Sequence, residues 1–209
     1  MRGDFIRSVS FIPRQIIFEQ GEIHEGCYLI CDGWVLLRVR TATGRLLVVD
    51  IAGPGKLIGI GSLLKQSRHE VSAQALTEVR ARHLTRTVVE QILQEPSVLT
   101  SRLLQVVARQ VKWIRRQSQI LAHRASVRER LAALLLELCH RYGTKLESGV
   151  TRIEPRLSVT LLAEMLDSNR GTVSEELSEL RQRGLVTCVQ GQFVILDETR
   201  LQKLAENVF

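Results

Sequence analysis

The sequence lacks long apolar runs. Its longest hydrophobic stretches, such as residues 131–136, are far shorter than the ~20 residues of a membrane-spanning helix, and the first residues form no apolar signal segment. The 209 residues are 44% hydrophobic, which is enough for two cores. We therefore expect a cytoplasmic protein without membrane contact, in which a sensor domain precedes a smaller effector domain.

Motifs of common enzymes and metal sites are also absent. The sequence has no phosphate-binding P-loop, no HExxH pair and no nucleophile elbow, and its five histidines are scattered over positions 24, 69, 83, 123 and 140. We expect no enzymatic activity, no metal and no cofactor. A haem-based gas sensor with a histidine or cysteine ligand is a further hypothesis, although no residue stands out as the ligand.

Cysteine is scarce, with only Cys27, Cys31, Cys139 and Cys188. A cytosolic chain keeps such thiols reduced. Cys27 and Cys31 lie in a strand-prone segment, where four steps of ~3.3 Å place them roughly 13 Å apart. Because that distance excludes one shared metal ion or a relaxed disulfide, we expect buried structural cysteines, with a redox or iron–sulfur role as the alternative.

Basic residues exceed acidic residues by 29 to 22, which gives a formal net charge of +7. Positive charge favours a nucleic-acid partner, because Lys and Arg neutralise phosphates. The excess lies in residues 1–123, since residues 124–209 contain 12 basic and 12 acidic residues. A DNA-binding hypothesis must therefore depend on particular residues rather than on total charge.

Short strands separated by glycine turns are predicted between residues 15 and 88, at 15–18, 27–31, 34–40 and 46–51. Thr43 and Gly44 lie between two apolar runs, which predicts a hairpin tip. The pattern indicates a β-rich sensor domain over residues 1–95.

A long helix is predicted over residues 96–123, because residues 98–122 contain no glycine or proline. Side chains spaced alternately by three and four residues are typical of a coiled-coil dimer seam, interrupted by one serine: Leu104, Val107, Val111, Ile114, Ser118 and Leu121. A second stripe, formed by Leu99, Leu103, Val106 and Trp113, would cover the β domain. A core helix within one subunit is the alternative, but five basic residues and no acid between Pro96 and His123 favour an exposed side.

Residues 124–209 have the element order of a winged helix-turn-helix: a helix capped by Ser126, a strand at 151–154, short helices at 159–166 and 170–183, and strands at 185–189 and 193–196. Ser158 and Asn169 are good N-caps, and Gly184 is a good stop. We expect these residues to face DNA: Ser158, Asn169, Arg170, Gly171, Thr172, Ser174, Glu175 and Ser178. An αα-hairpin packed in a core is the alternative.

Several segments resemble one family of regulators. The second short helix begins Asn169-Arg-Gly-Thr-Val-Ser174, and upstream lie Phe18-Glu-Gln-Gly-Glu22 and Leu57-Ile-Gly59. These segments are similar to those of the CRP/FNR family of cyclic-AMP-receptor-like regulators, and segments 121–124 and 138–143 look most like its cyanobacterial global nitrogen regulator branch. The resemblance implies an α+β chain with an N-terminal β-roll (a cyclic-nucleotide-binding-like jelly roll), a long dimerisation helix and a C-terminal winged helix-turn-helix.

Two departures from the family affect the DNA site. Family members usually have glycine where Asp167 stands, and Asp adopts the left-handed conformation less comfortably. Gly171 and Glu175 stand where the family often has an acid and an arginine. Because glycine reads no base and glutamate accepts from cytosine N4, we expect Arg170 to make the main guanine contact at a half-site that differs from the usual one.

The β-roll departs from the cyclic-nucleotide binders, which use Glu after the glycine for the ribose and an Arg-Ser pair for the phosphate. Here Ile60 follows Gly59, and Val71 precedes Ser72, so cyclic AMP is not expected to bind. The expected effector pocket comprises Gly59, Ile60, Ser62, Leu63, Arg68, Ser72 and Arg109. An acidic effector, such as the 2-oxoglutarate sensed by the nitrogen-regulator branch, and no effector at all are both left open.

The sequence therefore predicts a homodimeric transcription regulator that binds a pseudo-palindromic DNA site and works with RNA polymerase, independently of cyclic AMP. The alternative is a cyclic-nucleotide-like module whose winged helix binds protein, which the neutral C-terminal part and the pair Glu175 and Glu176 favour.

Overall fold

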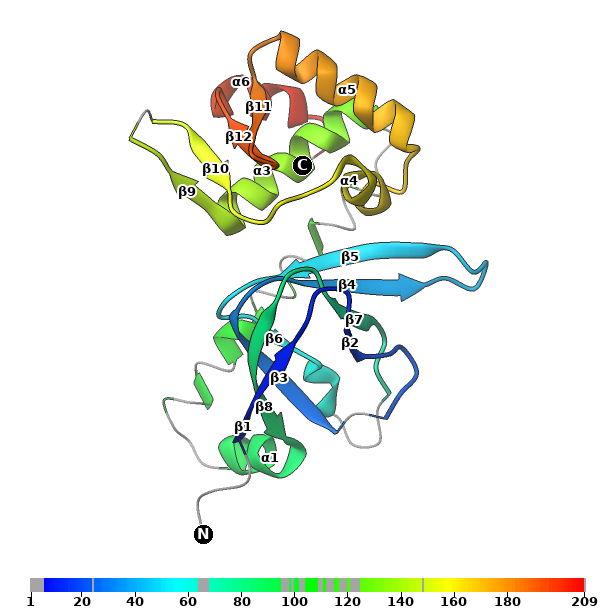
Figure 1. Ribbon diagram of the computed structural model, residues 1–209, viewed down its shortest axis with the longest axis vertical. Helices are drawn as coiled ribbons and strands as arrows, with labels where there is room; N and C mark the ends of the chain where they lie inside the picture. The colour runs from blue at the N-terminus through cyan, green and yellow to red at the C-terminus, as the bar shows by residue number, and fades with distance from the viewer. Residues whose placement is uncertain are drawn as a thin grey trace. The chain divides into compact units, whose positions relative to one another are not determined.

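The computed structural model describes residues 6–23, 25–63, 68–94, 98, 100–101, 104–108, 111, 115–116, 120, 125–147 and 149–208, without the side chains of Ser62 and Leu63. The chain forms two compact units, Met1–Trp113 and Ile114–Phe209. The first unit is rich in strands, and the second combines helices with a small sheet (Figure 1). The predicted fold class, with a β-rich domain, a long helix and a helix-turn-helix domain, is confirmed.

Two antiparallel sheets of four strands enclose the core of the first unit (Figure 1). One sheet has the order β1 (Ile6–Phe11), β8 (Val79–Thr85), β3 (Gly26–Asp32) and β6 (Leu57–Ile58). The other has the order β2 (Ile16–Phe18), β7 (Ser72–Ala75), β4 (Val35–Arg40) and β5 (Leu46–Ala52). Both sheets contribute to the core between them, with Ile30 and Ile58 from the first and Phe18 and Val35 from the second.

The four strands predicted between residues 15 and 51 are confirmed as β2 to β5. The hairpin tip at Thr43 and Gly44 is confirmed as well, because the Thr41 N–H donates to the Arg45 carbonyl at 2.8 Å. The prediction named none of the strands β1, β6, β7 and β8, and it missed the single-turn helix η1 (Ile60–Leu63) and α1 (Arg86–Gln94). The sequence of β7, Ser-Ala-Gln-Ala, contains none of the β-branched and aromatic residues that are typical of a strand.

The expectation of buried cysteines is correct for Cys27 and Cys139 and wrong for Cys31 and Cys188, which are exposed free thiols. Cys27 packs in a small apolar cluster with Leu57 and with Val89 of α1. Cys31 lies near the end of β3, where the pairing with β8 shifts register after Ile30. The apolar cluster that buries Cys27 therefore does not extend along β3 as far as Cys31.

The described residues from 98 to 120 are helical, as predicted for the long helix. Val106 packs against the Cys27 cluster, so the predicted stripe toward the β unit is confirmed at this residue, while Leu99, Leu103 and Trp113 lie outside the described residues. On the predicted dimer seam, Leu104 and Val111 are 62% and 60% exposed in the single chain, and Val107 is half-buried. Ile114, Ser118 and Leu121 of that seam lie outside the described residues.

The second unit is built around α3 (Val127–Tyr142), whose residues 131–139 are all buried. The sheet order is β11 (Val186–Val189), β12 (Gln192–Ile195), β10 (Thr151–Ile153) and β9 (Gly143–Lys145). α4 (Val159–Met165), α5 (Arg170–Gln182) and α6 (Glu198–Ala205) complete the unit. The predicted helices and strands are thus confirmed, whereas β9 and α6 were not foreseen.

Arg116 and Ile120 of the long helix are packed within this second unit. The Arg116 guanidinium donates to the carboxylate of Glu137, a buried residue of α3, at 2.5 Å. Ile120 is fully buried. These two described residues of the long helix therefore contribute to the unit that contains the helix-turn-helix.

None of the helices in the described part of the chain is long and apolar enough to cross a membrane.

Candidate nucleic-acid interface

The first helix of the pair, α4, is fixed at both ends. The Ser158 hydroxyl accepts a hydrogen bond from the Leu161 N–H at 3.1 Å, as expected for an N-cap. At the other end, Asp167 has φ +46°, and the Ser168 N–H returns to the Ala163 carbonyl at 3.0 Å. This is a Schellman end with aspartate in the position that glycine usually occupies. The predicted left-handed conformation of Asp167 is confirmed.

The second helix, α5, begins directly after this turn. The Asn169 carboxamide accepts from the Gly171 N–H at 2.7 Å, which closes the helix N-terminus as predicted. The helix ends at Gly184, where φ is +68° and the Leu185 N–H donates to the Leu180 carbonyl at 3.0 Å. Both ends of α5 are therefore set by local hydrogen bonds that the sequence encodes.

The two faces of α5 differ sharply in exposure. Val173, Leu177 and Leu180 are buried, as their spacing predicts. The opposite face exposes five predicted site residues together: Arg170, Gly171, Ser174, Glu175 and Ser178. Ser158 and Asn169 are exposed at the helix starts, and Thr172 is half-buried. All eight predicted residues thus lie on the helix pair, and seven of them are open to a partner.

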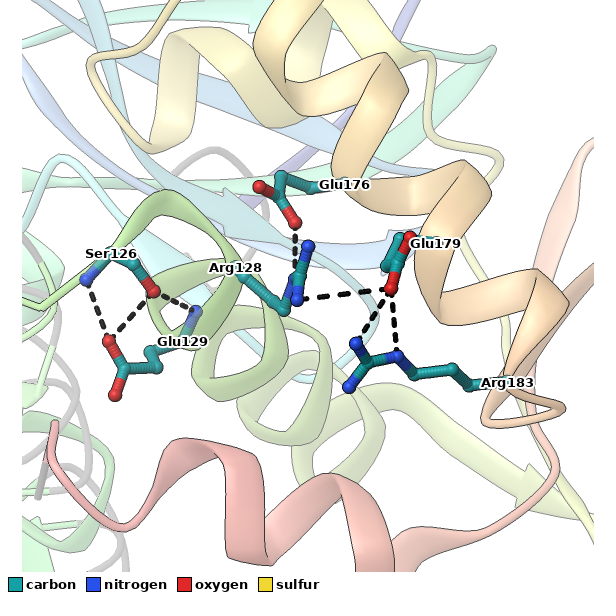
Figure 2. Close-up of polar contacts among 6 residues, drawn as sticks. All are labelled: Ser126, Arg128, Glu129, Glu176, Glu179 and Arg183. Atoms are coloured by element: carbon teal, nitrogen blue, oxygen red, sulfur yellow. Dashed lines mark hydrogen bonds and ion pairs between the residues drawn. The ribbon is translucent and has the colours of Figure 1, made fainter.

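An ion-pair network holds the remaining acidic residues of α5 (Figure 2). Arg128, in the first turn of α3, donates through Nε to Glu176 at 2.5 Å, and its Nη1 lies 3.9 Å from Glu179. Arg183 donates to the same Glu179 carboxylate at 2.7 Å. The hydrogen bond to Glu176 raises the pKa of the Arg128 guanidinium. Of the acidic pair Glu175 and Glu176, only Glu175 therefore belongs to the exposed face of α5.

The wing of the domain is the hairpin of β11 and β12, whose two turn residues, Gln190 and Gly191, both have positive φ. Beside this turn lies Arg156, whose Cδ is 3.8 Å from the point that a Cβ on Gly191 would occupy. Arg156 is exposed and precedes the Ser158 cap by two residues. Arg156 was not among the predicted site residues, although arginine is a common phosphate contact in protein–DNA interfaces.

Two polar residues of the predicted effector pocket are engaged by neighbouring backbone. Arg68 donates to the Gly21 carbonyl at 2.7 Å, and the Ser72 hydroxyl accepts from the Gln20 N–H at 3.0 Å. Gly59 has φ +73° and lies near His69, which is buried and stacks on the ring of Phe18 at 3.8 Å. The backbone of residues 20 and 21 therefore contacts two residues of the predicted pocket, Arg68 and Ser72.

The two residues that replace the family's polar contacts are used for packing. Ile60 packs against the cluster of Cys27, Leu57 and Val89, and Val71 packs against the core between the sheets. The side chains of Ser62 and Leu63, and the whole of Arg109, lie outside the described residues. Across the described part of the chain, no three His, Cys, Asp or Glu side chains are grouped to hold a metal ion.

Comparison with known proteins identifies both units. Residues 8–96 match the model of the cyclic nucleotide-binding domain, and residues 129–204 match the Crp-like helix-turn-helix domain. The CRP-like cAMP-activated global transcriptional regulator of Mycobacterium tuberculosis is 29% identical over 96% of this chain and 88% of its own length. The global nitrogen regulator of Synechocystis is 27% identical over 93% of this chain and 86% of its own. These similar identities do not single out the nitrogen-regulator branch.

A solved structure extends the similarity to three dimensions. A CRP/FNR-family transcriptional regulator from Thermus thermophilus is 26% identical, covers 97% of this chain and all of its own, and superposes with a TM-score of 0.74. Fold, element order and both domain models agree along the chain. The chain therefore belongs to the CRP/FNR family of transcription regulators, with a cyclic-nucleotide-binding-like domain followed by a helix-turn-helix DNA-binding domain.

Proposed function

We propose that the chain acts as a homodimer that reads a pseudo-palindromic DNA site through α5, with Arg170 as its guanine contact. The observation that carries this proposal is the exposed face of α5, where Arg170 stands at the N-terminus of the helix beside the Asn169 cap. The N-terminal residues of a recognition helix meet base edges in the major groove, and arginine pairs with guanine through O6 and N7.

Arg170 is also the single basic residue on the exposed first two turns of α5. Gly171 offers no side chain, Ser174 and Ser178 are short, and Glu175 repels phosphate. Base reading at guanine therefore falls to Arg170, while Glu175 is suited to accept from cytosine N4.

Phosphate contacts come from other parts of the same domain in this proposal. Arg156 lies between the start of α4 and the wing turn, and its guanidinium has no carboxylate partner among the described residues. The N-terminus of α5 adds a partial positive charge, which favours phosphate oxygens. These contacts compensate for the zero net charge of residues 124–209.

The test is a set of DNA-binding isotherms on a selected site and its point variants at several salt concentrations. We expect Arg170→Ala to remove the preference for guanine at one position of each half-site, a discrimination of about 1–3 kcal/mol. The salt dependence should stay nearly unchanged, because a base contact releases few counterions. Arg200→Ala, an exposed arginine in the first turn of α6, is the matched control and should behave as wild type. Equal weakening on every sequence would make Arg170 a phosphate contact and reject its reading role.

The proposed regulator does not respond to cyclic AMP. The Mycobacterium tuberculosis relative is described as cAMP-activated, but here Ile60 and Val71 are packed into apolar clusters. A ribose acceptor and a positive partner for the phosphate are missing at these two positions. Titration calorimetry with about 1 mM cyclic AMP should show no binding heat, and a micromolar dissociation constant would contradict the proposal.

RNA polymerase is the expected partner at the promoter and the cytoplasm the expected location, in keeping with a bacterial regulator of this family. The protein-binding alternative loses part of its basis, because Glu176 pairs with Arg128 instead of facing a partner. It takes the lead only if the wild-type protein shows no salt-dependent DNA binding.

A further inference from the structure

Arg128 occupies an unfavourable place for the helix that carries it. It is the second residue of α3 and lies between Ser126 and Glu129, the two residues that form the capping box. The N-terminus of a helix carries a partial positive charge, so a cation in the first turn destabilises the helix. The favourable electrostatic interactions of Arg128 must therefore be with residues outside α3.

These interactions are with acidic residues of α5. Figure 2 shows the Arg128 side chain extending from α3 toward Glu176 and Glu179, which are one helical turn apart. The side chains of Arg128 and Glu176 are 32% and 22% exposed, so water screens this pair less than a fully exposed one. Arg183 shares the Glu179 carboxylate from the end of α5. Two cations thus compensate two acids on the helix that faces DNA.

We infer that Arg128 is a positioning residue for DNA recognition: it ties the recognition helix α5 to α3 and cancels the acidic charge that α5 would otherwise present to the DNA phosphates. The inference rests on the proposal that α5 reads DNA. Without Arg128, Glu176 lacks its partner, α5 loses a cross-link to α3, and the carboxylate repels phosphates whatever the base sequence.

The experiment compares four full-length proteins: wild type, Arg128→Gln, Glu176→Gln and Arg128→Gln with Glu176→Gln. DNA affinity is measured by fluorescence anisotropy at several salt concentrations, and folding is checked by thermal melts. We expect Arg128→Gln to weaken binding to all sequences by about tenfold at low salt, and by less as salt rises. Removing Glu176 in the same chain should restore affinity to within about threefold of wild type.

Two further variants separate charge from geometry. Arg128→Lys keeps the charge but not the planar guanidinium, so it should lie between wild type and Arg128→Gln. Lys203→Gln, on the exposed side of α6 and outside the proposed site, removes the same charge and should change affinity by less than about twofold. If Lys203→Gln weakens binding as much as Arg128→Gln, net charge explains the effect and the inference is wrong.

The role of Arg128 is distinguished from direct phosphate contact by the double variant. A direct contact predicts that Glu176→Gln restores nothing, and that result overturns the inference, as does an affinity of Arg128→Gln within about twofold of wild type. Arg170→Ala in the same assay tests the proposed function itself. If Arg170→Ala loses its guanine preference while Arg128→Gln binds normally, only the inference about Arg128 fails.

Discussion

Asp167 and Gly184 terminate two consecutive helices, α4 and α5, in the same way. Each residue follows its helix and has the left-handed backbone conformation itself, with φ +46° at Asp167 and +68° at Gly184. In each case the N–H of the next residue donates to a carbonyl in the last turn of the helix. Glycine meets no steric penalty there, whereas a residue with a Cβ does. The turn between α4 and α5 therefore stores local strain that the end of α5 does not.

A series of substitutions at position 167 tests this interpretation. We expect Asp167→Ala to lower the free energy of unfolding by about 1 kcal/mol, because alanine has a Cβ and no side-chain oxygen to bond the local backbone. Asp167→Asn should stay near wild type, since asparagine also tolerates this conformation. Asp167→Gly should be more stable than Asp167→Ala, because glycine lacks the Cβ. Urea unfolding followed by circular dichroism gives these values, and equal stability of the alanine and glycine variants would show that the positive φ carries no cost.

At the scale of single elements, the helix-turn-helix was the most predictable part of the chain. The helix ends are marked by residues that act on nearby backbone groups: Ser158, Asn169 and Gly184. The predicted bounds of α4 and α5 therefore differ from the observed ones by only one residue, at the C-terminal end of each helix. The apolar spacing of α5 likewise indicated which face is buried. Local chemistry was sufficient for these features.

Contacts between distant elements were not predictable from the same patterns. Glu175 and Glu176 are neighbours in sequence, yet only Glu176 pairs with Arg128, which is 48 residues away. Arg68 and Ser72 were expected in an effector pocket, but both bond the backbone of residues 20–21, some 47 to 52 residues earlier. Such long-range interactions produce no periodic pattern in the sequence, because they depend on how separate elements pack against each other.

At the scale of the whole molecule, the seam of the long helix makes a prediction about assembly. Leu104 and Val111 are exposed in the single chain, where large apolar side chains favour a partner surface. Val111→Asp should place a charge in that surface and give monomers in sedimentation velocity. The affinity of the Val111→Asp variant for DNA with both half-sites should fall strongly, because a monomer binds only one half-site at a time.

Val98 supplies the matched control for this experiment. It is similarly exposed on the same helix, at 69%, but does not belong to the predicted seam. Val98→Asp should therefore remain dimeric and bind DNA as wild type. A dimeric Val111→Asp, or a monomeric Val98→Asp, would show that the interface lies elsewhere.

The ion pair of Arg116 and Glu137 makes the end of the long helix a structural part of the helix-turn-helix unit. Glu137 is buried in α3, and a buried carboxylate that loses its cation is strongly destabilising. Unwinding the long helix at Arg116, or pulling Ile120 out of its buried site, therefore lowers the stability of the DNA-binding domain itself. A DNA-binding fragment cut after residue 124 would therefore lack the buried Ile120 and the cation that pairs with Glu137.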